Sequence, residues 1–151
     1  MCYALKGNYT RYKAIKAAQY VRLASLTKEL WTAAMVAQIQ RQKYFRWHDA
    51  GDVQDVQHLE KIFEVCRLTP DTKHWMPTRE AWIKDHLTSK PDNLVIRFSP
   101  PMIGQENTTW PNSSMVVTEG ASCPAPSQGG KCGDCRQCWD PAVKVVSYGK
   151  H

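Results

Sequence analysis

The first third of the chain repeats side chains at helical spacing. Two such runs lie within residues 10–41: Ile15, Ala18, Arg22 and Leu26, then Trp31, Met35 and Ile39. Spacings of three and four residues place side chains on one face of a helix, so we expect two helices in succession over 10–41. Between the runs, the stretch SLTKEL can begin a new helix, with Thr27 as its N-cap.

The pattern changes to alternation at KYFRWHD, residues 43–49, which favours a β-strand. The AGD stretch that follows, residues 50–52, is typical of a turn. An apolar stripe then spans three turns of a predicted helix and consists of Val56, Leu59, Ile62, Phe63 and Cys66. Asp52 is placed to cap the start of this helix, and Cys66 is expected in the core.

Runs typical of strands dominate the remainder of the chain. They cover residues 72–78, 93–99, 114–120 and 142–149. A helix is expected over 78–87, with Thr78 as its N-cap. The turn-rich segment 100–113 is a long loop of the kind that often borders a site. Because helices and strands alternate, we predict an α/β fold with a mainly parallel sheet and flanking helices, similar to a partial βα barrel.

Length and composition are those of a globular protein. A chain of 151 residues with 42% hydrophobic residues predicts a single α/β domain over 1–151. No apolar run approaches the roughly 20 residues that span a bilayer. The start MCYALKGNYT lacks the basic-then-apolar order of a signal peptide. We therefore expect a cytoplasmic protein that does not bind a membrane.

The net charge of +6 favours an anionic partner, with nucleic acid as the first candidate. Basic residues are densest between Lys6 and Arg46, without forming a continuous block. A solvated basic face of a helix explains the same pattern. A host protein is the other partner class that we consider.

Four of the six cysteines are crowded into CPAPSQGGKCGDCRQC near the C-terminus. Their spacing is C-x8-C-x2-C-x2-C, and the residues are Cys123, Cys132, Cys135 and Cys138. Cytoplasmic thiols stay reduced, which favours metal ligation over disulfides. Overlapping C-x2-C steps are typical of a 4Fe–4S cluster, and four thiolates also satisfy tetrahedral zinc. We therefore predict a metal-binding loop over 121–141, inserted before the last strand, that holds a 4Fe–4S cluster or Zn²⁺.

The neighbours of the four cysteines fit a closed metal site. Lys131 and Arg136 lie inside the loop, and their charge favours thiolates. Trp139 is expected to pack over the site and shield it from water. A site with four protein ligands has no open coordination position, so a structural role is the more frequent one. Cys2 is either an exposed thiol or an additional ligand.

A second polar group follows the strand predicted at 43–49. RWHDAGDV holds His48, Asp49 and Asp52 around Gly51. Ligands bind beyond the carboxyl ends of parallel strands, and these residue types serve acid–base catalysis or metal binding. We predict His48, Asp49 and Asp52 as catalytic candidates, and Gly51 with Asp52 as cofactor-binding candidates. The alternative is structural: Asp52 caps the helix, Gly51 makes the turn, and His48 is buried with its hydrogen bonds satisfied.

Other chemistry-bearing residues are scattered. Glu119 ends a predicted strand in TEGAS and adds a carboxylate to the candidates. His58, His74 and His86 stand singly and are expected on helix or strand surfaces. The sequence has no phosphate-binding Gly-rich loop, no nucleophile elbow and no HExxH motif.

Three stretches give the chain a family resemblance: CYALKGNY near the start, FRWHDAGDV, and the end CPAP…GKCGDCRQCWD…VSYGKH. Together they resemble the bacteriophage and prophage proteins of the gene product 88 family, over nearly the whole chain. The resemblance implies phage or prophage origin, and hence the cytoplasm of the host cell.

A more distant, truncated likeness is to radical S-adenosylmethionine enzymes, which are partial or full βα barrels. The CYA at Cys2 is similar to the end of their three-cysteine loop, and the AGD at 50–52 falls where their Gly-plus-acid motif lies. Only Cys2 of that loop is present here, so an N-terminal three-cysteine cluster cannot form in this chain alone.

Three functions follow as hypotheses. The first is a phage-encoded metal-binding protein that acts by binding nucleic acid or a host protein. The second is an iron–sulfur enzyme, or the remnant of one, related to radical S-adenosylmethionine proteins. The third is an inhibitor of a host defence system, which a small basic protein would fit. The closed cysteine site and the basic charge favour the first.

Overall fold

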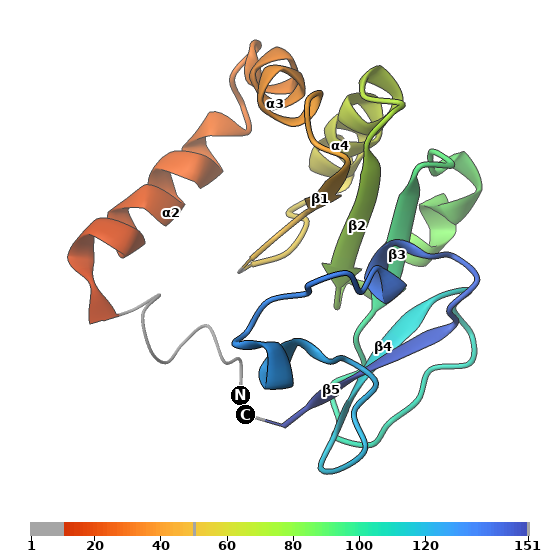
Figure 1. Cartoon of the computed structure of the whole chain (residues 1–151). Helices are drawn as coiled ribbons and strands as arrows, with labels where there is room; N and C mark the ends of the chain where they lie inside the picture. The colour runs from red at the N-terminus through yellow and green to blue at the C-terminus, as the bar shows by residue number, and fades with distance from the viewer. Residues whose placement is uncertain (1–10, 50, 151) are drawn as a thin grey trace.

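Five parallel strands form one sheet that curls into a half-barrel (Figure 1). The computed structural model describes residues 11–49 and 51–150. The strands lie in chain order and are β1 Tyr44–Arg46, β2 Lys73–Thr78, β3 Leu94–Phe98, β4 Ser113–Val117 and β5 Val145–Gly149. Every pairing between them is parallel, so the predicted α/β fold with a mainly parallel sheet is confirmed.

Among the described residues, two helices precede the sheet, α2 Lys13–Ser25 and α3 Trp31–Ile39, as the helical spacing predicted. α2 stands away from the sheet, and none of its residues is buried (Figure 1). α3 packs against α4, Val56–Leu68, which follows β1. Thr27 does not cap α3: Leu30 occupies the N-cap position, while the Thr27 hydroxyl donates to a carbonyl oxygen at the end of α2.

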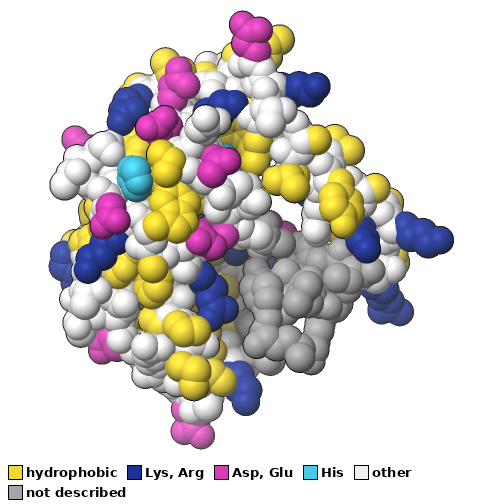
Figure 2. Space-filling model, turned by 180° about the vertical axis from the view of Figure 1, so that it is seen from behind, with side chains coloured by type: hydrophobic (Ala, Val, Ile, Leu, Met, Phe, Trp, Pro, Cys, Tyr) yellow, Lys and Arg dark blue, Asp and Glu magenta, His cyan; other side chains and the backbone are white. Residues whose placement is uncertain are grey.

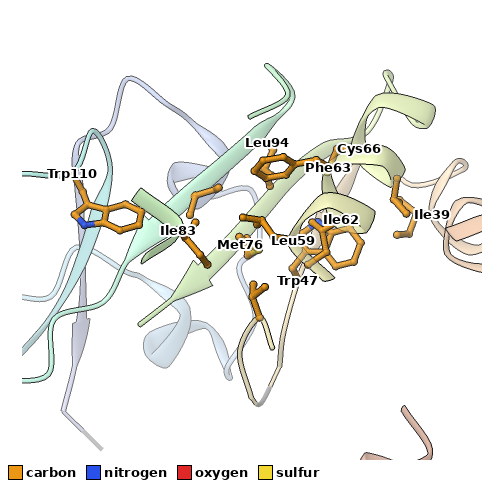
Figure 3. Packing of buried hydrophobic residues seen from close by; sticks show 13 residues of the cluster. Ile39, Trp47, Leu59, Ile62, Phe63, Cys66, Met76, Ile83, Leu94 and Trp110 are labelled. Carbon is orange, nitrogen blue, oxygen red and sulfur yellow. The ribbon is translucent and has the colours of Figure 1, made fainter. Parts of the chain in front are cut away.

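α4 supplies more of the core on one face of the sheet than any other element (Figure 3). The predicted stripe is buried at Leu59, Ile62, Phe63 and Cys66, with Cys66 fully inaccessible. Val56, the first member of the predicted stripe, is 41% exposed. Met76 and Leu94 pack against the stripe from β2 and β3. Each fully buried aliphatic side chain stabilises the fold by roughly 2 kcal/mol, so this layer fixes how β1 to β3 are placed.

The N-cap of α4 is Asp55 and not Asp52. The backbone N–H of His58 donates to Asp55 Oδ1 at 2.8 Å. The helix begins at Val56, so only the residue directly before it can take the capping geometry. The turn is thus three residues longer than the sequence suggested, which leaves Asp52 free for a contact with β2.

Two predicted boundaries change at the ends of strands. β1 is shorter than the predicted 43–49, since His48 leaves strand geometry with a φ of 53°. Ala81–Ser89 form a 3-10 helix, η2, in place of the helix expected over 78–87. Thr78 ends β2, and its hydroxyl accepts the Glu80 backbone N–H at 3.0 Å. Thr78 therefore turns the chain at the strand end and does not N-cap a helix.

The C-terminal segment, residues 118–144 between β4 and β5, covers the face of the sheet opposite α4 (Figure 1). It carries two short 3-10 helices, η3 Ala125–Gln128 and η4 Gln137–Trp139. Successive strand residues point to opposite faces, so Met76 meets α4 while Trp75 packs with η4. This arrangement brings the cysteine-rich segment onto β2 and β3.

Candidate functional site

The four clustered cysteines lie in the segment between β4 and β5. Cys138 is buried on η4, Cys123 and Cys135 are half-buried, and Cys132 is exposed. The backbone N–H of Cys123 donates to the Ser147 carbonyl of β5 at 3.0 Å. The Cys135 N–H donates to the Cys132 carbonyl, also at 3.0 Å. The first bond holds Cys123 against the sheet, and the second closes a C-x2-C step into a turn.

The Cys138 thiol lies in a small apolar cluster, with its Sγ 3.1 Å from the Tyr148 hydroxyl. Burial raises the pKa of this thiol, whereas the hydrogen bond to Tyr148 and the charge of Arg97 act in the opposite direction. The charges of Cys123 and Cys132 raise the same pKa further. Burial is thus the largest influence on the pKa of the Cys138 thiol.

Arg97 on β3 is fully buried and ties the cysteine segment to the sheet. Its guanidinium donates six hydrogen bonds, at 2.7 to 3.5 Å, to the backbone carbonyl oxygens of Ser113, Gln137, Cys138, Asp140, Val143 and Lys144. Burial lowers the pKa of this guanidinium, but arginine stays protonated in proteins. A full positive charge is thus held in the interior beside the segment that carries Cys138.

Trp139 fastens the segment to β1. Its indole N–H donates to the Phe45 carbonyl at 3.0 Å. The ring packs edge-on against Tyr44 and Trp75, with centroids 5.5 and 5.3 Å away. The Arg136 guanidinium lies 4.7 Å from the centre of the Tyr44 ring. The indole contact with Phe45 therefore joins residues that stand 94 positions apart in the sequence.

The thiols do not converge on one point. Within residues 11–49 and 51–150, no group of three or more His, Cys, Asp or Glu side chains is arranged to hold a metal ion. The metal-binding loop predicted from the cysteine spacing therefore stays a prediction. Cys2, the other possible ligand, lies outside the described residues.

His48 lies at the carboxyl end of β1, where the sequence placed it. It adopts the left-handed backbone region, which is uncommon for a residue with a side chain. Burial and the neighbouring His58 lower the pKa of His48 to about 4, so the ring is neutral at pH 7. The two rings meet edge-on with centroids 5.7 Å apart. Within the described chain His48 Nε2 is buried without a hydrogen-bond partner, so the structural alternative of a satisfied histidine is wrong in this detail.

Asp52 joins the turn after β1 to the end of β2. Its Oδ1 accepts the Val53 N–H at 2.8 Å and the Thr78 hydroxyl at 2.7 Å, and its Oδ2 accepts the Arg79 N–H at 2.7 Å. Gly51 has a φ of 86°, which a residue with a Cβ rarely adopts. Asp49 is exposed. The structure thus brings His48 and Asp52 together, while Asp49 points to the surface.

Two histidines expected on surfaces are buried. The Trp47 indole N–H donates to His74 Nδ1 at 3.2 Å, so the His74 proton sits on Nε2, 2.9 Å from the Thr69 hydroxyl. Burial lowers the pKa of His74 to about 4. His58 accepts the Gln54 N–H on Nδ1 at 3.3 Å, and burial lowers its pKa as well. A single histidine in a polar stretch gives no sequence signal of burial, because the packing partners come from elsewhere.

The sequence reasoning also missed Arg97 and Tyr148. A signal for Arg97 was present, since a charged residue in the centre of the apolar run NLVIRFS must find partners when that strand is buried. Tyr148 gave no such signal, because its partner Cys138 is brought close only by the fold. The loop residue Glu119 is exposed beyond the end of β4.

The model of the gene product 88 family matches residues 1–101 of the chain. The chain belongs to the gene product 88 family. This membership confirms the family resemblance and supports phage or prophage origin. The match covers the stretches at CYALKGNY and FRWHDAGDV but ends before the cysteine segment, so it is shorter than the resemblance implied.

No curated protein and no solved structure gives a significant match to this member of the gene product 88 family. The likeness to radical S-adenosylmethionine enzymes therefore has no support from the comparisons. Over the described residues, no helix is long and apolar enough to cross a membrane.

Proposed function

We propose that this gene product 88 protein is a phage-encoded metal-binding protein. Its ligands are Cys123, Cys132, Cys135 and Cys138, which hold a 4Fe–4S cluster or Zn²⁺. The observation that carries the proposal is a buried Cys138 thiol next to a fully buried guanidinium, that of Arg97.

Charge gives the first supporting argument. Four thiolates around Zn²⁺ or a doubly charged 4Fe–4S core leave a net charge of about −2. A buried arginine is unfavourable without compensation, and the six bonds of Arg97 go to neutral carbonyl groups. An anionic metal centre beside Cys138 would supply the opposite charge.

The chain between the ligands gives the second argument. Cys132 and Cys135 already share a hydrogen-bonded turn, and Cys123 is held against β5. The stretch between Cys123 and Cys135 contains Gly129, Gly130 and Gly133, all at positive φ. These glycines let the backbone rearrange at little steric cost, so the outer three thiols can close onto Cys138. A centre closed in this way has no open position and stabilises the C-terminal segment.

Metal analysis tests the proposal. The full chain is purified without oxygen, and its iron, sulfide and zinc are measured along with its absorption spectrum. For a 4Fe–4S cluster we expect a brown protein with about four iron atoms per chain. For zinc we expect a colourless protein with about one zinc ion per chain. Purified chain that holds neither metal, and takes up neither on reconstitution, would overturn the proposal.

A matched pair of cysteine variants locates the ligands. Cys135→Ala should abolish metal retention and lower stability, because one of the four ligands is lost. Cys66→Ala is the control, since Cys66 is buried in the core against α4 and lies outside the cysteine segment. Equal metal content in the two variants would contradict ligation by the segment.

A second candidate function, nucleic-acid binding, is favoured by α2. This helix carries Lys13, Lys16 and Arg22, contains no acidic residue, and leaves Tyr20 63% exposed. Figure 2 shows basic and hydrophobic side chains together on the arm that α2 forms. Exposed lysines beside an aromatic ring suit phosphates and stacked bases.

The nucleic-acid function is tested with labelled single-stranded and duplex DNA oligonucleotides. Binding should weaken steeply with salt, and Lys13→Ala with Lys16→Ala should weaken it further. The matched control is Lys73→Ala with Lys84→Ala, two exposed lysines away from α2. Absence of DNA binding at low salt, or an equal loss of DNA affinity in the two double variants, would contradict a role for α2.

A further inference from the structure

Tyr148 and Arg97 surround Cys138 with polar contacts on two sides. The Tyr148 hydroxyl meets the Cys138 sulfur at 3.1 Å. Arg97 donates its Nε–H to the Cys138 carbonyl at 3.0 Å. Cys138 is the most buried of the four clustered cysteines, with 7% of its surface exposed. The Cys138 sulfur is therefore held by a residue of β5, and the Cys138 backbone by a residue of β3.

We infer that Tyr148 and Arg97 are the positioning residues of the metal centre, with Cys138 as its anchoring ligand. This inference rests on the proposed metal-binding function. It concerns the residues behind the ligands, which set how tightly a metal is held and how its charge is stabilised.

The role of Tyr148 follows from the chemistry of a ligating cysteine. A cysteine binds metal as the thiolate, which has no proton to donate. In the hydrogen bond between Cys138 and Tyr148, the hydroxyl must then be the donor. An O–H directed at a metal-bound sulfur withdraws charge from it, which favours the more reduced form of an iron–sulfur cluster and the deprotonated form of a zinc ligand.

The role of Arg97 follows from its geometry. Its terminal nitrogen Nη2 donates to the Gln137 and Asp140 carbonyls at 2.7 and 2.8 Å, on either side of Cys138. With the bond from Nε, three consecutive contacts hold the backbone of η4 in place. Lysine has one donor group and cannot reproduce this fork. Arg97 therefore holds the backbone of Cys138 in one position, and its positive charge offsets the negative charge of the metal centre.

Tyr148→Phe is the decisive variant, since it removes one hydroxyl and leaves the ring in the cluster. Tyr44→Phe is the matched control: the Tyr44 ring packs against Trp139 in the same segment, and in the described chain its hydroxyl makes no hydrogen bond. Both variants and the wild type are compared on the metal that the wild type holds. For zinc, Co²⁺ is titrated into metal-free protein and its thiolate-to-metal absorption is followed; for iron–sulfur, the reduction potential is measured.

We expect Tyr148→Phe to weaken Co²⁺ binding about tenfold, or to lower the reduction potential, with Tyr44→Phe unchanged. Arg97→Lys should lose metal affinity even though the charge is kept. If Tyr148→Phe and Tyr44→Phe match the wild type on these readouts, the inference is wrong while the metal-binding function stands. If the wild type binds no metal, the proposed function itself fails, and the inference fails with it.

Discussion

The Thr78 hydroxyl donates a hydrogen bond to Asp52 Oδ1 at 2.7 Å and thereby joins the carboxyl ends of β1 and β2. The same carboxylate accepts two backbone N–H groups, one on each side of the junction. Asp52, predicted as a catalytic and cofactor-binding candidate, thus uses its carboxylate to hold the turn after β1 against the end of β2. His48, beside it, keeps an unpartnered nitrogen and remains the stronger candidate at this end of the sheet.

Asp52→Asn should destabilise the fold by about 1–3 kcal/mol. The amide can keep the bonds to Val53 and Thr78 through its oxygen, but its nitrogen cannot accept the Arg79 N–H. Urea unfolding measures the change. Asp85→Asn, an exposed position on η2, is the control and should stay within about 0.5 kcal/mol of the wild type. Equal stability of the two variants would show that the Asp52 contacts contribute nothing.

Acid should destabilise the protein through its buried histidines. The unfolded chain binds protons at an ordinary histidine pKa of 6.5, whereas burial lowers the pKa of His74 to about 4 in the fold. The stability that depends on neutral His74 is therefore complete above pH 6.5. It is lost as the pH falls from 6.5 to 4, by about 3 kcal/mol in total. His48, with a pKa also lowered to about 4, changes stability in the same direction.

Urea unfolding between pH 8 and pH 4 measures this loss, and His74→Gln shows which residue causes it. The variant should be less stable than the wild type at pH 8, because it loses the bonds to Trp47 and Thr69. The difference in free energy of unfolding between the wild type and the variant should become smaller toward pH 4, since the variant has no buried imidazole to protonate. A difference that stays constant with pH would contradict this account.

Trp139→Phe should loosen the C-terminal segment. It removes the indole N–H that reaches the Phe45 carbonyl and should lower stability by about 1 kcal/mol. Limited proteolysis should cut faster between β4 and β5. Trp82→Phe is the matched control, because the Trp82 N–H bonds Glu80 only two residues away and joins no distant segments. Equal rates of proteolysis between β4 and β5 in the two variants would show that Trp139 does not hold this segment in place.

The cysteines should differ sharply in reactivity. Cys66 is inaccessible, and burial raises the pKa of its thiol to about 12. In metal-free native protein, a thiol reagent should label exposed Cys132 first and Cys66 only on unfolding. Mass spectrometry of the labelled peptides gives the order. Labelling of Cys66 at the rate of Cys132 would mean that the core against α4 opens readily.

Much of the fold could be read from local patterns. The stripe that ends at Cys66 predicted α4, and the run NLVIRFS predicted β3, because both depend on the side-chain period of a single element. Strand and helix alternation gave the parallel sheet for the same reason. The capping residue of α4 was misplaced from Asp55 to Asp52, since both are plausible caps and only the helix start decides between them.

The candidate sites were less accessible to prediction. The sequence singled out His48 and Cys138 as chemistry-bearing residues, and their roles stay predictions. It could not show that His58 meets His48, or that Tyr148 meets Cys138. Such pairs join elements that are separate along the chain, and no spacing records them.

By itself, the sequence determined which segments form helices and strands, and it placed four thiols in one short segment. Those properties follow from local periodicity and spacing, which act over a few residues. Only the tertiary structure decided that Arg97 lies buried beside that segment, and that Asp52 binds Thr78. The reason is that burial and hydrogen bonding satisfy polar groups with whatever partners the folded chain brings near, however far apart they stand in the sequence.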